Sequence, residues 1–289
     1  MAKTANYYVT FRSNDTCEFH TIWQDEEFQK IGESGYQDVL KQLKQQGVKR
    51  LNITGGEPLL RDGLPDLLKQ AKASGFETQL STNGILYADL AGHLTGLVDR
   101  LYFALDYPFA SEHDRSRGVE CFKTALAAIE QARTLNQRPI IKFTMTRESV
   151  RFLPEMVDLA ARLRVPVYLS PVYDHFGLQG FEPSTIDHIL YYSRRRHVLV
   201  NRAALEFVKR GGNNLVLSRC RAQETTVTIL PDGRQVLPCF FNQAGRQGQA
   251  AACASCLRWP YILPSFTRGI DKYYWLNLYS EMINRRKLA

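Results

Sequence analysis

The chain has 289 residues, of which 44% are apolar and 23% are charged, and this ordinary globular composition excludes a disordered or fibrous protein. No segment approaches the roughly 18 to 20 consecutive apolar residues that a membrane helix needs, and residues 1–11 lack the apolar core of a signal peptide. Six cysteines are too few for a secreted disulfide framework. We therefore expect a cytoplasmic protein whose cysteines are free thiols or metal ligands.

The net charge is +8, from 37 Lys and Arg against 29 Asp and Glu, and part of it is concentrated within residues 194–210. Such a basic face can attract phosphates or acidic peptides, but a solvated helix surface is the simpler interpretation. The nearby Tyr191 and Tyr192 do not alternate with the basic residues as they would in a stacking surface for nucleic acid. We expect neither a membrane nor a nucleic acid as partner.

Extended and helical patterns alternate along the first 170 residues. The predicted strands are residues 7–11, 48–54, 76–81, 100–105, 140–145 and 165–169. The predicted helices between them are residues 36–46, 62–74, 90–97, 122–135 and 153–163. This alternation predicts an α/β fold with a parallel sheet and crossover helices. Because six strands are too few for a closed eight-stranded barrel, we predict a partial (β/α)6 TIM-like barrel.

The pattern changes after about residue 180, where a single basic helix is predicted for residues 186–210. The region beyond it holds four of the six cysteines. We therefore predict a barrel at residues 1–180, a basic helical connector at 181–214 and a small cysteine-rich module at 215–289.

Polar segments follow the first four predicted strands. They are Ser13 to His20, Gly55-Gly56-Glu57-Pro58, Ser81-Thr82-Asn83-Gly84, and a longer segment with Asp106 and Arg117. The loops at the carboxyl ends of parallel strands are where such folds carry their functional residues. Adjacent glycines let a backbone approach a ligand closely, and a carboxylate beside them can bind an amine. We expect a ligand site at this edge of the sheet.

The C-terminal region contains a pattern typical of a metal site. Cys220 and Cys239 flank a predicted hairpin with a Pro-Asp-Gly turn, and Cys253-Ala-Ser-Cys256 follows. Four thiolates in this arrangement can bind zinc or an iron–sulfur cluster. The remaining Cys121 opens a predicted helix and is interpreted as a small buried residue.

In their order and spacing, these segments resemble the radical S-adenosylmethionine (SAM) superfamily, in the branch with a C-terminal SPASM or twitch module, over about residues 7–260. Members of that family hold a 4Fe-4S cluster on a Cys-x3-Cys-x2-Cys loop after the first strand, and reductive cleavage of bound SAM yields a 5′-deoxyadenosyl radical. The resemblance implies an auxiliary 4Fe-4S cluster rather than zinc at the four C-terminal cysteines.

The resemblance also implies a SAM site. Gly55, Gly56 and Glu57 would hold the amino group of SAM, Ser81 and Asn83 would lie along its nucleoside, and Arg117 would reach its carboxylate. The full implied set is Gly55, Gly56, Glu57, Pro58, Ser81, Asn83, Asp106 and Arg117. No catalytic residue is predicted.

The sequence departs from the family at the first loop, where Ser13, Cys17 and His20 stand at the three ligand positions. Imidazole can bind iron in a cluster, whereas a serine hydroxyl is a hard and poor ligand for it, so this set can hold a labile second 4Fe-4S cluster or zinc. Ala104 is a second departure, because this branch often has a serine there.

Three hypotheses follow. The first is an enzyme that uses a reductant and cleaves SAM to modify a peptide or small metabolite. The second is a non-catalytic family member that binds such a ligand or a protein partner. The third, in which SAM serves only as an electrophile, ranks last because no dedicated base stands out.

Overall fold

The computed structural model describes residues 3–18, 24, 32–172, 181–213, 218–239, 253 and 256–288. Its centre is a nine-stranded sheet in the order β7-β6-β5-β4-β3-β2-β1-β8-β9. The strands are β1 (Lys3–Thr10), β2 (Val48–Gly55), β3 (Glu77–Thr82), β4 (Arg100–Ala104), β5 (Pro139–Met145), β6 (Val167–Pro171), β7 (Val198–Leu199), β8 (Thr226–Ile229) and β9 (Gln235–Val236). All neighbouring strands are parallel except β8 and β9, which form an antiparallel pair.

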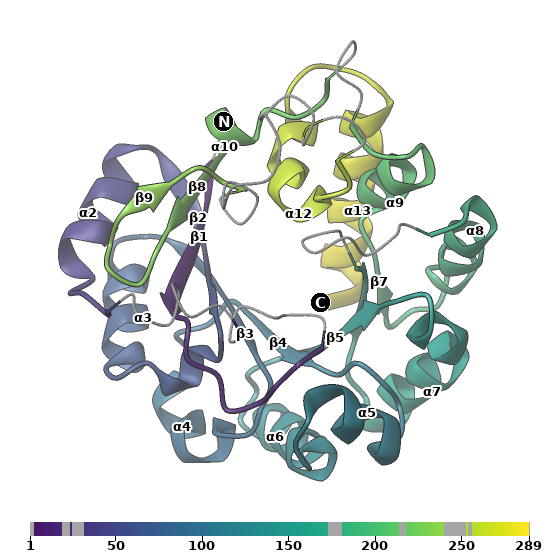
Figure 1. The fold of residues 1–289 in the computed structure, drawn as a ribbon, viewed down its shortest axis with the longest axis horizontal. Helices are drawn as coiled ribbons and strands as arrows, with labels where there is room; N and C mark the ends of the chain where they lie inside the picture. The colour runs from purple at the N-terminus through teal and green to yellow at the C-terminus, as the bar shows by residue number, and fades with distance from the viewer. Residues whose placement is uncertain are drawn as a thin grey trace.

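Helices surround this sheet on its outer side, and the strands curve into an open arc (Figure 1). The α-helices are α2 (Gln37–Gln45), α3 (Leu64–Ala73), α4 (Tyr87–Leu94), α5 (Ala110–Arg117), α6 (Phe122–Thr134), α7 (Leu153–Leu163), α8 (Pro183–Tyr192), α9 (Arg202–Lys209), α10 (Ala222–Thr225), α12 (Trp259–Ile262) and α13 (Lys272–Leu288). Short 3-10 helices are η2 (Pro58–Leu60), η3 (Ser149–Phe152) and η5 (Leu263–Thr267). None of the helices in the described ranges has both the length and the apolar content that crossing a membrane requires.

The main core lies between the outer helices and the sheet. In α3 the buried residues Leu64, Leu67, Leu68 and Ala71 repeat at helical spacing and form one apolar face. In β4 the buried Leu101 and Phe103 alternate with partly exposed residues, so one face of the strand packs on the helices. The predicted α/β partial barrel is therefore confirmed, and the six predicted strands correspond to β1 through β6.

The inner face of the sheet is polar. The amide of Asn52 on β2 donates to the side chain of Asn6 on β1 at 3.0 Å. Arg100 on β4 contacts Glu77 on β3 at 3.2 Å and Glu281 on α13 at 3.6 Å. Apolar residues thus face the helices, and these polar residues face the inside of the barrel.

The prediction of a single helix at residues 186–210 was wrong. The segment forms α8 and α9 with strand β7 between them. Val198 is fully buried and pairs with Val167 of β6, because this apolar, β-branched run adds to the sheet edge. Asn201 then begins α9, since its side chain accepts a hydrogen bond from the Ala204 amide at 3.0 Å.

The C-terminal region continues the barrel sheet. Strand β8 pairs in parallel with β1, from Thr4 opposite Thr226 to Tyr7 opposite Ile229. The side-chain NH of Trp259 donates to the carbonyl oxygen of Pro171 at 3.0 Å, which fastens α12 to the end of β6. The predicted domain boundaries at residues 180 and 214 stay predictions, but the β8–β9 hairpin shares one sheet with the barrel.

Candidate ligand site and metal centre

Glu57 joins the loops that follow β2 and β3. Its Oε1 accepts hydrogen bonds from the Leu59 amide at 3.0 Å and the Thr82 hydroxyl at 2.7 Å, and its Oε2 accepts one from the Asn83 amide at 2.7 Å. Burial raises the pKa of the Glu57 carboxyl to about 7, although these three donors act in the opposite direction. Glu57 thus serves as a buried connection between two loops, and Pro58 begins η2 beside it.

Gly55 and Gly56 face the backbone at the end of β1 and just after it. A Cβ on Gly55 would lie 2.1 Å from the carbonyl oxygen of Thr10, and one on Gly56 would lie 2.0 Å from that of Arg12. The amides of Gly56 and Glu57 donate to the same two carbonyl oxygens at 2.9 and 2.8 Å. The close approach that the glycine pair permits is therefore an approach between two segments of this chain.

Arg117, at the end of α5, lies between two buried carboxylates. Its Nη1 donates to Asp15 Oδ2 at 3.0 Å, and its Nε lies 2.6 Å from Asp106 Oδ2. The second contact is an ion pair without hydrogen-bond geometry. Burial lowers the pKa of Arg117, but the charges of Asp106, Cys17 and Asp15 outweigh this effect and raise it. Arg117 therefore stays charged inside the protein.

Asp15 is the carboxylate that connects the first loop to the rest of the site. Its Oδ1 accepts from the Ser13 hydroxyl at 2.7 Å, and its Oδ2 also accepts from the side-chain amide of Asn83 at 3.0 Å. Burial raises the pKa of Asp15, but the charge of Arg117 and the hydrogen bonds from Ser13 and Asn83 hold it below its ordinary value. The loops after β1, β3 and β4 thus meet at Asp15.

His113 and Lys142 lie around this network. His113 Nδ1 accepts a hydrogen bond from the Asp106 amide at 3.2 Å, and burial lowers the pKa of the imidazole to about 4. The neutral ring therefore acts as a fixed acceptor at neutral pH. The pKa of Lys142, on β5, is lowered. Burial is the main cause and the charge of Arg117 adds to it, whereas the charge of Asp106 acts in the opposite direction. Neither residue was predicted to take part in the site.

The structure thus connects four of the eight residues of the implied SAM set. Glu57, Asn83, Asp106 and Arg117 belong to one network, and it includes Asp15. Ser81 lies on β3 opposite Tyr102 of β4, outside these contacts. Asp15 was not predicted, because the ligand spacing of the first loop picks out Ser13 and Cys17 on either side of it.

The first loop contains Ser13 and Cys17, whereas His20 lies outside the described residues. Cys17 is buried and close enough to Arg117 for its charge to affect that residue's pKa. The Ser13 hydroxyl is used as a donor to Asp15. A 4Fe-4S cluster is held mainly by soft thiolates, so the described part of this loop does not fit one.

The four C-terminal cysteines lie near one another. Burial raises the pKa of the Cys220 thiol, and the charges of Cys256, Cys239 and Cys253 raise it further. The carbonyl oxygens of Cys253 and Cys256 accept hydrogen bonds from Asn213 at 3.1 and 3.0 Å. Within the described ranges, no three such side chains are already close enough to hold a metal ion. Four thiols are nevertheless a donor set that fits an iron–sulfur cluster or zinc.

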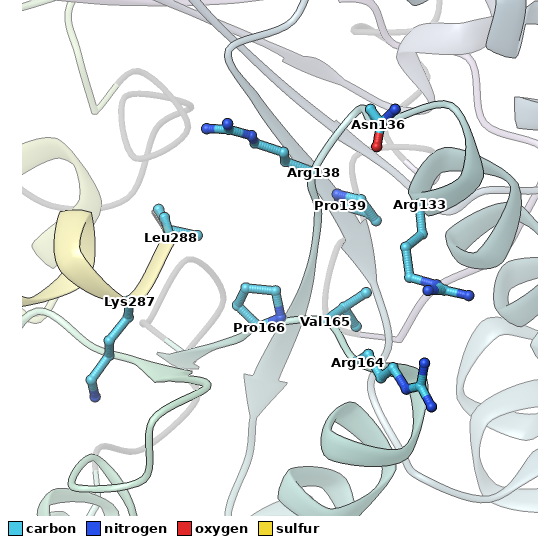
Figure 2. A pocket seen from close by; sticks show the side chains of 9 residues that line it. All are labelled: Arg133, Asn136, Arg138, Pro139, Arg164, Val165, Pro166, Lys287 and Leu288. Atoms are coloured by element: carbon cyan, nitrogen blue, oxygen red, sulfur yellow. The ribbon is translucent and has the colours of Figure 1, made fainter.

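A pocket of about 280 Å³ lies at the opposite end of the sheet. Figure 2 shows its lining residues, which are Arg133, Asn136, Arg138, Pro139, Arg164, Val165, Pro166, Lys287 and Leu288. They come from the ends of α6, α7 and α13 and from the segments that lead into β5 and β6. Basic side chains at helix C-termini compensate the helix dipoles, and Lys287 donates to three backbone carbonyls at 2.7 to 2.9 Å. None of the predicted site residues lines this pocket.

Comparison with known proteins shows the family of this chain. A model of the Radical SAM superfamily matches residues 16–160. The chain belongs to the radical SAM superfamily. It is 31% identical over 231 residues to a protein of Methanopyrus kandleri named "Probable GTP 3′,8-cyclase", with 70% of this chain and 71% of the relative covered. It is 26% identical over 259 residues to the tungsten-containing aldehyde ferredoxin oxidoreductase cofactor-modifying protein of Pyrococcus furiosus, with coverages of 80% and 69%.

A similar fold is also found among solved structures. Streptococcus suis SuiB bound to S-adenosylmethionine superposes with a TM-score of 0.69 at 16% identity, covering 90% of this chain and 66% of that one. At this identity the likeness shows the fold alone. The chain thus spans about two thirds of the length of SuiB.

Proposed function

We propose that this chain is a radical SAM family protein that does not cleave SAM reductively. In this proposal it holds an auxiliary 4Fe-4S cluster in a SPASM or twitch-like module and uses the barrel to bind a peptide, a small metabolite or a protein partner. The observation that carries the proposal is the hydrogen bond from Ser13 to Asp15. Because of this bond, the Ser13 hydroxyl, which stands at a cluster-ligand position of the first loop, donates to a side chain of the protein itself.

Two features of the first loop support the loss of its cluster. Cys17 is the one thiol in the described part of the loop, and three soft ligands are needed to leave a single iron open. The Thr16 and Glu18 amides donate to the backbone carbonyls of Arg117 and Ser116 at 2.9 and 3.1 Å. These hydrogen bonds hold the backbone of the loop against α5.

The C-terminal cysteines support the auxiliary cluster. Burial and nearby thiols raise the pKa of Cys256 as well as that of Cys220, and a metal ion would relieve this by binding the thiolates. Arg258 contacts the sulfur of Cys256 at 3.8 Å and offers it a positive charge. Such a neighbour stabilises a thiolate, the form that binds iron.

The test is anaerobic purification with iron, sulfide and zinc quantified, followed by a SAM-cleavage assay under dithionite. We expect about four irons per chain, as one 4Fe-4S cluster supplies, and no 5′-deoxyadenosine. The variant with Ser13→Cys and His20→Cys should bind a second cluster, and Cys121→Ser serves as a control because Cys121 is a free, buried thiol that stands at none of the predicted metal-ligand positions. Two clusters in the parent together with 5′-deoxyadenosine would overturn the proposal, and zinc in place of iron would overturn the auxiliary cluster.

A further inference from the structure

The inference concerns the ligand that the barrel site accepts, and it rests on the proposed function. We propose that the Asp15 side chain occupies the place on Arg117 that the carboxylate of SAM would otherwise take. The site then favours an adenosyl ligand that lacks a carboxylate over SAM. The family resemblance assigns the SAM carboxylate to Arg117. In the structure that side chain already binds a carboxylate of the protein.

Both oxygens of Asp15 have partners inside the site. Oδ2 accepts from Arg117 Nη1 and from Asn83 Nδ2, each at 3.0 Å, and Oδ1 accepts from the Ser13 hydroxyl at 2.7 Å. Its side chain is only 5% exposed. Asn83 also donates to Asn14 Oδ1 at 2.8 Å and accepts from the Ile85 amide at 3.1 Å. The two groups that would receive SAM are therefore occupied by the first loop.

The position of Asp15 is fixed by the backbone that follows it. On the C-terminal side, the Thr16 and Glu18 amides donate to carbonyl oxygens of α5, as described above. Gly118 lets the loop approach, because a Cβ there would lie 1.9 Å from the Thr16 hydroxyl oxygen. A carboxylate held in place before binding loses little conformational entropy when it occupies Arg117, which favours it over the free carboxylate of a ligand.

The charge balance disfavours a further carboxylate. Arg117 carries one positive charge and faces Asp15 and Asp106, both buried, and Lys142 lies near Asp106. The carboxylate of SAM would either join them as a third negative charge on one guanidinium or displace Asp15 and leave it buried without its ionic partner. Both alternatives are unfavourable in a buried site. An adenosyl ligand with an amine and no carboxylate avoids both.

The test compares SAM with decarboxylated SAM, which differs only in lacking the carboxylate. Isothermal titration of the intact, cluster-loaded protein with each ligand gives two dissociation constants. We expect the wild type to bind decarboxylated SAM at least tenfold more tightly than SAM. Asp15→Asn should shift the ratio at least tenfold toward SAM, because the amide leaves Arg117 free for the ligand. A purely structural role of Asp15 would weaken both ligands and leave the ratio unchanged.

Asp99→Asn is the matched control, because Asp99 accepts from the Thr78 amide at 2.7 Å and from Lys72 at 2.6 Å and does not contact the first loop. Its ratio should equal that of the wild type. Tighter binding of SAM by the wild type would overturn the inference even if Asp15→Asn does not fold. Absence of binding by either ligand would overturn it too, while the iron content of the same preparation tests the proposed function separately.

Discussion

The pH dependence of stability is set in opposite directions by two buried groups of the site. Glu57 has its pKa raised from 4.5 to about 7, so the folded state keeps a proton that the unfolded state loses, and stability falls as the pH rises through this range. His113 has its pKa lowered from 6.5 to about 4, so the unfolded state gains the proton first, and stability rises with pH between these values. Between pH 4.5 and 6.5 the two effects oppose each other.

Where a group binds its proton in only one of the folded and unfolded states, it changes the free energy of unfolding by about 1.4 kcal/mol per pH unit. Replacing Glu57 with Gln removes the pH dependence that comes from Glu57 and leaves the one that comes from His113. The free energy of unfolding of Glu57→Gln, relative to wild type, should therefore increase with pH by about 3 kcal/mol from pH 4.5 to 7. His113→Gln should show the opposite trend, with its free energy of unfolding relative to wild type decreasing from pH 4 to 6.5.

Urea unfolding followed by circular dichroism at half-unit pH steps measures these differences. The loss of hydrogen bonds to Glu57 lowers stability by an amount that does not depend on pH, so only the slope tests the reasoning. Curves for Glu57→Gln and wild type that stay parallel from pH 4.5 to 7 would refute the raised pKa of Glu57. The same slope change in Asp187→Asn, an exposed carboxylate paired with Lys209, would show that it does not come from the buried site.

The remaining predictions concern packing around β1. Gly56→Ala should lower the free energy of unfolding by about 3 kcal/mol, because its Cβ would lie 2.0 Å from the Arg12 carbonyl oxygen. Gly92→Ala in α4 should raise the free energy of unfolding by about 1 kcal/mol, because the space around Gly92 is open. The hydroxyls of Tyr8 and Tyr261 share a buried hydrogen bond of 2.8 Å. Tyr8→Phe should cost about 1 kcal/mol, and adding Tyr261→Phe should cost less than the sum of the single changes. Additive losses would contradict direct coupling.

The strands and most helices of the barrel could be predicted from the sequence because their apolar residues repeat at the spacing that the sheet and helices require. Helix α5 was not predicted, because the residues it buries are His113, Ser116 and Arg117 and it has no apolar face. A helix whose buried side is polar has no apolar repeat to detect. Its burial depends on partners from distant loops, which the sequence does not reveal.

The same limit applies to the site. The order of the polar segments after the strands predicted that they meet at one edge of the sheet, because parallel strands end together, and Glu57, Asn83 and Arg117 do come together there. Asp15 carried no such signal, since a single acidic residue in a polar loop is ordinary. Its importance comes from lying against Arg117, which is 102 positions further along the chain.

The pairing of β8 with β1 gives the two cysteine-bearing regions unequal evolutionary freedom. The first loop follows the end of β1, so its ligands can be exchanged without removing a strand from the sheet. The C-terminal cysteines flank β8 and β9, and losing that region would leave β1 as an unprotected edge open to aggregation. Selection for solubility alone can therefore retain the C-terminal region, whichever ligands the first loop carries.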